Sequence, residues 1–266
     1  MRTNPPVLAV HGGAGNWSEE MLEKAKLELA KALERGYEEF RRGSSLEAVV
    51  EAVAYMEDSG VFNAGVGAVQ TERGTRRTDA GVMLGPGLKV GAVGNTRLKN
   101  PIRAALRVLQ EGRHVLIVSE GAEEVSGSSS QGVFDTVGAV ALDKDGTLAA
   151  ATSTGGIAGK REGRIGDSPI PGAGFYATYE SASSCTGVGE YIMRVLPAKE
   201  VDILISMGFD AESASLAVTR KMTRLFGDHT FGIIVLDKYG NLGNEFNTRA
   251  MPRGLKDSAR TLVEGP

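Results

Sequence analysis

The sequence has little of what several classes of protein require. It has one cysteine, Cys185, which excludes an internal disulfide framework, and its three scattered histidines are too few for an obvious zinc site. It has no apolar run of about 18 residues, so no membrane segment is expected, and the run 7–10 is too short for the core of a signal peptide. The net charge of -3 without a long block of one sign gives no electrostatic basis for binding nucleic acid. We therefore expect a cytoplasmic protein that acts on a small molecule.

Glycine is the residue in excess. The chain has 36 glycines in 266 residues, about twice the average share of roughly 7%, which indicates many tight turns or close backbone approaches. Gly12-Gly13-Ala14-Gly15 lies between a predicted strand and a predicted helix, where a phosphate-binding loop can lie. However, neither Gly-x-Gly-x-x-Gly nor Gly-x-x-x-x-Gly-Lys-Ser/Thr occurs, so nucleotide binding is not favoured.

Hydrophobic periodicity predicts a layered protein of helices and antiparallel strands. Helices are predicted over 19–42, after a cap at Ser18, and over 44–56, with a capping box formed by Ser44 and Glu47. Further helices are predicted over 101–109, 187–195, 198–206 and 211–225, and strands over 7–10, 78–84, 88–93, 115–118, 137–142, 148–153 and 231–236. Two hairpin turns share one pattern, at 143–146 and 237–240. These hairpins argue against a doubly wound parallel sheet and favour a layered α/β (α+β) domain. Segment 121–134, rich in Gly, Ser, Glu and Gln, is predicted to be a flexible linker.

Thr136 begins an apolar strand immediately after this linker. A threonine hydroxyl needs a base to accept its proton, and a free α-amino group on the same residue can serve, since its pKa of about 7.7–8.0 suits work near neutral pH. The alternative interpretation is a β-branched residue that opens an ordinary buried strand. A chain cut between Asp135 and Thr136 would expose this nucleophile at a new N-terminus.

Other polar residues lie where they can serve such a nucleophile. Because segments 137–142 and 148–153 form a hairpin, Thr154 is expected to lie near Thr136. Arg164 and Asp167 share a glycine-rich loop and suit the two charges of an amino acid, or else form a loop salt bridge. The Thr186 hydroxyl and the Gly187 N–H, at a predicted helix start, can polarise a carbonyl oxygen or simply cap the helix.

The three histidines are interpreted as structural. His11, His114 and His229 each lie beside a predicted strand, and neither a Gly-x-Ser-x-Gly elbow nor a His-Glu-x-x-His helix accompanies them.

Taken together, these motifs resemble the plant-type L-asparaginase/isoaspartyl peptidase family nearly from end to end. The motifs that carry the resemblance are His11-Gly12-Gly13-Ala14-Gly15, Phe62-Asn63-Ala64-Gly65, Asp135-Thr136-Val137-Gly138-Ala139-Val140, Thr152-Ser153-Thr154-Gly155-Gly156, Gly163-Arg164-Ile165-Gly166-Asp167-Ser168-Pro169 and Cys185-Thr186-Gly187. The resemblance implies one N-terminal nucleophile (Ntn) hydrolase domain over 1–266, a four-layer αββα sandwich. It also implies self-cleavage into an α subunit, 1–135, and a β subunit, 136–266, with two such αβ units associating.

The resemblance also implies roles for individual residues. Thr136 would be the nucleophile, Thr154 its neighbouring hydroxyl and Asn63 its support. Arg164 would bind the substrate α-carboxylate and Asp167 the α-ammonium, while Thr186 and Gly187 would form the oxyanion hole. No cofactor is expected for catalysis, but backbone carbonyls of one loop would hold a structural sodium ion. The residues of that loop are Met56, Glu57, Ser59, Phe62, Ala64 and Val66.

The resemblance implies hydrolysis of L-asparagine to L-aspartate and ammonia, and of β-aspartyl dipeptides, through a Thr136 acyl-enzyme. Two alternatives stay open. One is a glycosylasparaginase-like amidase, because the grip of Arg164 and Asp167 serves both substrates and relatives of that enzyme also have Asp-Thr at the cut. The other is an uncleaved Ntn scaffold that binds an amino acid without turning it over. The chain departs from many relatives in its short linker and in having Asp135, where they have glycine.

Overall fold

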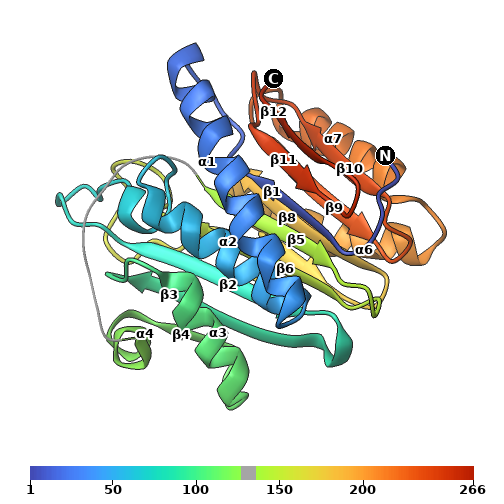
Figure 1. Cartoon of the computed structure of the whole chain (residues 1–266). Coiled ribbons are helices and arrows are strands. Elements are labelled where there is room, and N and C mark those ends of the chain that lie inside the picture. Colours follow the sequence, from blue (N-terminus) through green and yellow to red (C-terminus); the bar gives the residue numbers. More distant parts are fainter. Residues whose placement is uncertain (127–135) are drawn as a thin grey trace.

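The computed structural model describes residues 1–126 and 136–266. Within these residues two β-sheets form the centre of the molecule (Figure 1), the larger with 8 strands in the order β12-β11-β1-β5-β6-β2-β3-β4 and the smaller with 4 strands in the order β10-β9-β8-β7. Neighbouring strands of the described residues are antiparallel apart from the parallel pair β3 and β4. The strands are β1 (Val7–His11), β2 (Thr78–Leu84), β3 (Lys89–Thr96), β4 (Leu116–Val118), β5 (Val137–Leu142), β6 (Leu148–Thr154), β7 (Phe175–Ala177), β8 (Ser181–Gly187), β9 (Phe231–Asp237), β10 (Leu242–Phe246), β11 (Arg253–Lys256) and β12 (Thr261–Glu264).

The helices lie on the outer faces of the two sheets. They are α1 (Glu19–Glu38), α2 (Ser45–Ser59), α3 (Pro101–Glu111), α4 (Ser119–Ser126), α5 (Gly189–Val195), α6 (Pro197–Ser206) and α7 (Ala211–Phe226), with short 3₁₀ turns at Glu39–Arg41, Gly65–Gly67 and Pro86–Leu88. Among the described residues, none of the helices combines the length and the apolar character that crossing a membrane requires.

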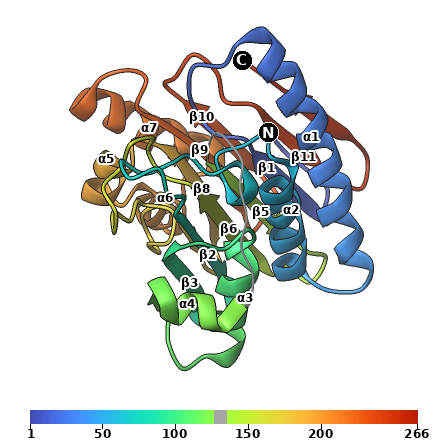
Figure 2. The same cartoon turned by 90° about the vertical axis from the view of Figure 1, so that its left-hand side faces the viewer.

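Three apolar layers hold the four structural layers together. The first, which includes Leu29 and Val49, lies between helices α1 to α3 and the large sheet. The second joins the two sheets through side chains such as Phe175, and the third joins the small sheet to α6 and α7 through side chains such as Val218. Figure 2 shows α1 and α2 on one side of the sheets and α5 to α7 on the other. This order confirms the αββα sandwich expected of an Ntn hydrolase.

Local signals in the sequence explain where the helices begin. The Ser18 hydroxyl accepts a hydrogen bond from the Met21 N–H at 3.3 Å at the start of α1. Ser44 and Glu47 form the reciprocal capping box of α2, in which the Glu47 carboxylate accepts the Ser44 N–H at 2.9 Å. These side chains satisfy N–H groups that have no partner within the helix, so both helices begin where the sequence predicts.

The predicted linker 121–134 differs from the structure in its first part. Helix α4 extends to Ser126, so residues 121–126 form the end of a helix and not a flexible linker. Ala122 is fully buried, and the Glu123 carboxylate accepts a hydrogen bond from the Arg97 N–H at 2.9 Å. This apolar anchor and this contact outweigh a composition that is typical of a linker. The remainder, 127–134, and the predicted cleavage residue Asp135 lie outside the described residues.

Candidate active site

The β5–β6 hairpin brings two threonine hydroxyls together. Thr136 immediately precedes β5, Thr154 ends β6, and the pairing of Val137 with Ser153 sets the register. The Oγ1 atoms of Thr136 and Thr154 lie 2.8 Å apart, a hydrogen-bond distance. Thr154 is buried and Thr136 is half-buried, so Thr136 is the more exposed member of the pair.

The turn after β6 fixes the Thr154 hydroxyl. The Gly156 N–H donates to Thr154 Oγ1 at 2.9 Å, and the Gly156 carbonyl accepts a hydrogen bond from Asn63 Nδ2 at 2.6 Å. Asn63 is itself held, because its Oδ1 accepts the Val69 N–H at 3.0 Å. A Cβ on Gly155 would lie 2.2 Å from Asn63 Oδ1, so glycine is required there. Asn63 therefore holds the turn that fixes the Thr154 hydroxyl beside Thr136.

Arg164 and Asp167 lie side by side but do not form the loop salt bridge that was the alternative prediction. Arg164 Nε instead donates to Glu190 Oε1 at 2.9 Å. Among the described residues Asp167 Oδ2 has no hydrogen-bond partner, although it is buried. A Cβ on Gly189 would lie 2.7 Å from Asp167 Oδ1 and 2.9 Å from Arg164 Nη2. The two opposite charges thus flank a space that glycine keeps open.

A surface depression gives access to Arg164. Its lining includes Ile157, Lys160, Arg164 and Glu190, whereas Asp167 is buried behind it. The Arg164 side chain is 16% exposed and that of Glu190 is 47% exposed. A charged ligand can therefore approach Arg164 from solvent and compete with Glu190 for its donors.

Burial governs the electrostatics of this loop. Burial raises the pKa of Asp167 to about 7, an effect that Arg164 opposes. Beneath the loop lies fully buried Asp79, whose carboxylate accepts the Asn95 N–H at 2.7 Å. Lys160 Nζ lies 3.8 Å from Asp79 Oδ2, and burial raises the pKa of Asp79 and lowers that of Lys160. The loop therefore rests on a buried pair of opposite charges.

Thr186 and Gly187 end strand β8 and do not begin a helix, so the predicted helix start is wrong. Helix α5 begins at Gly189, and its N-cap residue Val188 makes no side-chain cap. Thr186 Oγ1 instead accepts the Ala14 N–H at 3.2 Å, which leaves its own proton free to donate. Gly187 has a φ of +136°, and a Cβ there would lie 2.2 Å from the Thr230 carbonyl oxygen. Only glycine fits this strand end.

The segment expected to be a sodium-binding loop is a loop only in part, because Met56, Glu57 and Ser59 lie at the end of α2 and the rest joins this helix to the turn Gly65–Gly67. A Cβ on Gly65 would lie 2.2 Å from the Lys99 carbonyl oxygen and 2.9 Å from that of Glu57, so carbonyl oxygens crowd this point. The Met56, Phe62 and Ala64 carbonyls each accept one hydrogen bond inside the loop, and each oxygen has a second lone pair. Burial raises the pKa of Glu57 to about 8. Oxygen donors of this kind fit a hard cation.

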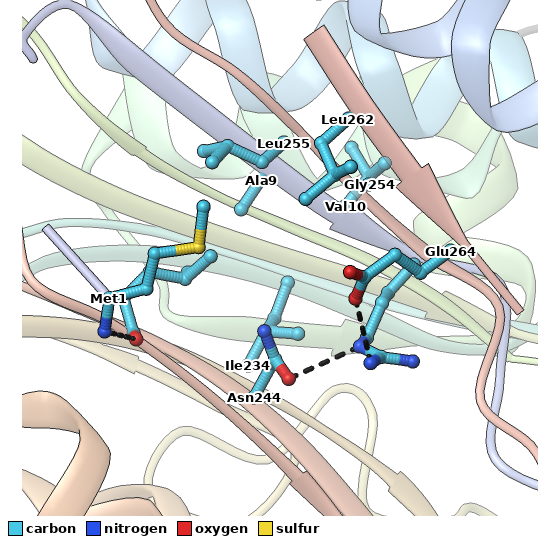
Figure 3. Close-up of a pocket in the computed structure, with 11 residues that line it drawn as sticks. Met1, Ala9, Val10, Ile234, Asn244, Gly254, Leu255, Leu262 and Glu264 are labelled. Atoms are coloured by element: carbon cyan, nitrogen blue, oxygen red, sulfur yellow. Dashed lines mark hydrogen bonds and ion pairs between the residues drawn. The ribbon is translucent and has the colours of Figure 1, made fainter. Parts of the chain in front are cut away.

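A separate cavity lies between the two sheets near β11 and β12. Figure 3 shows its lining, which is largely apolar, and the contacts between its polar side chains. Arg253 Nε donates to Asn244 Oδ1 at 3.1 Å, and Arg253 Nη2 lies 2.7 Å from Glu264 Oε2. Of the predicted site residues that the structure describes, none lines this cavity, so it is separate from the candidate active site.

Three residues of the site were not singled out from the sequence. Glu190 lies close in the sequence to Thr186 and Gly187, but its pairing with Arg164 could not be inferred without the fold. Asp79 and Lys160 lie far from each other in the chain, and their proximity depends on the pairing of β2 with β6, where Asp79 lies opposite Thr154. No pattern of neighbouring residues in the sequence predicts how β2 and β6 pair.

An αββα sandwich whose central strands carry a threonine pair at one end is the architecture of an Ntn hydrolase. The chain matches the family model described as asparaginase over residues 4–132 and 125–263. It belongs to the asparaginase family. This result confirms the family predicted from the motifs.

Curated relatives extend over nearly the whole chain. It is 41% identical to a plant-type L-asparaginase of Pyrobaculum calidifontis, with 93% of this chain and 95% of that protein covered. It is 40% identical to an isoaspartyl peptidase of Escherichia coli, with 97% and 95% covered, and 38% identical to a plant-type L-asparaginase of Pyrococcus horikoshii, with 92% and 94% covered. The alignment with the E. coli protein spans 307 positions against 266 residues here, so that relative has residues that this chain lacks.

Proposed function

We propose that this chain hydrolyses the side-chain amide of L-asparagine and the isopeptide bond of β-aspartyl dipeptides after cutting itself before Thr136. The observation that carries the proposal is the Thr136–Thr154 hydroxyl pair at 2.8 Å. The names of the relatives, L-asparaginase and isoaspartyl peptidase, support the two substrates. An ordinary α-peptide bond does not fit, because its α-carboxyl group is already part of the amide.

Self-cleavage and hydrolysis use the same oxygen atom. In the first step Thr136 Oγ1 attacks the carbonyl carbon before it, the peptide C–N bond breaks, and the Thr136 nitrogen leaves with the proton as a free amine. Water then hydrolyses the resulting ester, which restores the hydroxyl and leaves a carboxylate at Asp135. The new α-amine is the base for the next reaction.

In the hydrolytic reaction the amine accepts the Thr136 hydroxyl proton while the oxygen attacks the substrate side-chain carbonyl. The Thr186 hydroxyl and the Gly187 N–H stabilise the oxyanion. The leaving ammonia or amine takes the proton from the Thr136 amine, and water resolves the β-aspartyl ester to aspartate. Histidine is not needed: His114 and His229 are exposed, while burial lowers the pKa of His11 to about 3 and Ser184 occupies its Nε2.

Arg164 and Asp167 are the proposed anchors for the two charges of the substrate. The planar guanidinium can bind the α-carboxylate with two donors, and the unpaired Asp167 oxygen can accept the α-ammonium. With both α-groups held, the side-chain carbonyl is the group left to face Thr136.

Activity on three substrates tests the proposal. Purified protein should hydrolyse L-asparagine and β-aspartyl dipeptides, and a denaturing gel should show two fragments that correspond to 1–135 and 136–266. Faster hydrolysis of a glycosylated asparagine than of either substrate would favour the glycosylasparaginase-like alternative. A chain that stays intact and binds aspartate without turnover would favour the inactive scaffold and contradict the proposal.

The variant Arg164→Lys tests the carboxylate anchor. Lysine keeps the charge but not the planar pair of donors, and loss of one charge-assisted hydrogen bond costs about 1.5–3 kcal/mol, so kcat/KM should fall roughly tenfold to a hundredfold. Steady-state kinetics on L-asparagine measure the change. Arg161→Lys, at an exposed position of the same loop, is the matched control and should keep wild-type kinetics. Equal kinetics in both cleaved variants would remove Arg164 from the site.

Three further features are proposals from the family resemblance. Two αβ units associate into a dimer, the carbonyl loop at Met56–Val66 holds a structural sodium ion, and the protein acts in the cytoplasm. The crowded carbonyl oxygens around Gly65 support the ion, and the single cysteine is compatible with a reducing compartment.

A further inference from the structure

A continuous chain of hydrogen bonds joins the two sheets beneath the candidate site. His11 Nε2 on β1 lies 2.9 Å from Ser184 Oγ on β8, and Ser184 Oγ lies 2.8 Å from Thr152 Oγ1 on β6. The Thr152 hydroxyl donates to the Gly174 carbonyl oxygen at 3.1 Å. All three side chains are fully buried. Apolar residues fill most of the layer between the sheets, so this chain is an unusual polar contact in that layer.

The donors in this series of hydrogen bonds can be assigned in one direction, from His11 to Gly174. Burial lowers the pKa of His11 to about 3, so its ring is neutral and carries one proton. His11 Nδ1 has no partner among the described residues, and a buried N–H without a partner is less tolerable than an unused acceptor. The proton therefore belongs on Nε2. His11 then donates to Ser184, Ser184 to Thr152, and Thr152 to the Gly174 carbonyl.

Two of the three links lie two residues from a residue of the proposed mechanism, and the third, His11, pairs with the strand that follows Thr136. Thr152 precedes Thr154 by two positions and Ser184 precedes Thr186 by two, so each points to the same face of its strand as its partner. Gly138 follows Thr136 by two positions and is paired with both His11 and Thr152. The hydrogen-bond chain is thus the layer of side chains directly beneath the reacting groups.

Gly138 shows how closely the nucleophile strand lies against this chain. A Cβ at this position would lie 1.9 Å from Ser184 Oγ and 2.4 Å from His11 Nε2. Apolar contacts between the sheets are not directional, so they do not fix how β5 and β8 lie relative to each other. Hydrogen bonds of fixed length and angle do.

We propose that His11, Ser184 and Thr152 are positioning residues, which set the spacing of the two sheets and thereby hold Thr136 against the oxyanion donors of β8. None of them touches the substrate. This inference rests on the proposed function, since it concerns the geometry of the same reaction. It gives His11 a role that its interpretation as a structural histidine did not include.

Two adjacent serines provide the test. Ser184→Ala breaks the chain at its centre, whereas Ser183→Ala removes a hydroxyl that is equally buried but points to the other face of β8, where it bonds to the Ala198 carbonyl at 3.3 Å. We expect Ser184→Ala to lower kcat roughly tenfold to a hundredfold, as small misplacements of reacting groups do, with KM near its wild-type value and slower self-cleavage. Ser183→Ala should lower only the Tm.

A second pair keeps the test informative if Ser184→Ala does not fold. Thr152→Val preserves shape and removes the hydrogen bonds, whereas Thr152→Ser preserves the hydroxyl. We expect Thr152→Val to lose kcat and Thr152→Ser to recover most of it. An active wild type with undiminished kcat in Ser184→Ala, or in a folded Thr152→Val, would overturn the positioning role alone. A wild type that neither cuts itself nor hydrolyses asparagine would overturn the proposed function and this role with it.

Discussion

A Thr136→Ala chain should stay intact at 266 residues and show no hydrolysis of L-asparagine or β-aspartyl dipeptides. Alanine lacks the oxygen that attacks in both reactions, and without the cut the α-amine that serves as base is never released. The hydroxyl of Thr154 does not replace it, because it is buried and held by the Gly156 N–H. Intact-mass measurement after prolonged incubation, followed by an ammonia-release assay, measures both losses.

The control for this experiment is Thr136→Ser. Serine keeps the nucleophilic oxygen and loses the methyl group, so this variant should retain part of both activities. A Thr136→Ala protein that still yields two fragments would show that another group performs the cut. One that hydrolyses asparagine while intact would remove Thr136 from the reaction.

Asp167→Asn should affect activity and stability in opposite directions. Asparagine at this position cannot offer a negative charge to the α-ammonium, and removal of one partner of a buried charge pair costs about 2–5 kcal/mol, so kcat/KM should fall roughly thirtyfold to a few thousandfold. In the wild type, kcat/KM should also fall as the pH drops below about 7, where Asp167 takes up a proton. The variant should lose this part of the pH dependence.

The stability effect follows from the sign of the pKa shift. The pKa of Asp167 in the folded protein is about 7, above the value of about 3.9 in an unfolded chain. Its contribution to stability is therefore fully present below pH 3.9 and is lost as the pH rises toward 7. The neutral amide avoids this loss, which is on the order of 1–4 kcal/mol. The Tm of Asp167→Asn should exceed that of the wild type, and by more at pH 8 than at pH 5.

A second buried aspartate is the matched control. The Asp202 carboxylate accepts hydrogen bonds from Thr178 and Ser181 and pairs with Lys199. Because these partners stabilise its charge, Asp202→Asn should lower the Tm and leave kcat/KM unchanged. If Asp167→Asn also had a lower Tm than the wild type at pH 8, the charged Asp167 side chain would not destabilise the folded protein, and the prediction would be wrong.

Local patterns in the sequence predicted much of the fold. The Ser44–Glu47 capping box and the two similar hairpin turns depend on neighbours a few residues apart, and the structure contains all three. Helix α4 was missed because one fully buried residue, Ala122, outweighs a composition that is typical of a linker. The predicted helix start at Gly187 was wrong by two residues, because pairing with β9 holds Thr186 and Gly187 in a strand and α5 begins at Gly189. Both errors arose from contacts between distant segments.

The candidate site divides in the same way. The hairpin turn at 143–146 was enough to predict that Thr136 and Thr154 meet. The loop motif singled out Arg164 and Asp167 as candidate binding residues, and that role stays a prediction. The pairing of Arg164 with Glu190, rather than Asp167, depends on where α5 begins. The hydrogen bond between His11 and Ser184 joins residues 173 positions apart on different sheets, so neither its existence nor its role was visible in either motif.

The order of strands in the large sheet determines what a cut before Thr136 can do to the molecule. β1 from the first fragment is inserted between β11 and β5 from the second, and β2 from the first is paired with β6 from the second. Strands of the two fragments would alternate within one sheet, and separating the fragments would break the hydrogen bonds of several strand pairs at once. A native gel should therefore show one species even when a denaturing gel shows two. Exchange of pieces between molecules would proceed only as fast as the whole sheet unfolds.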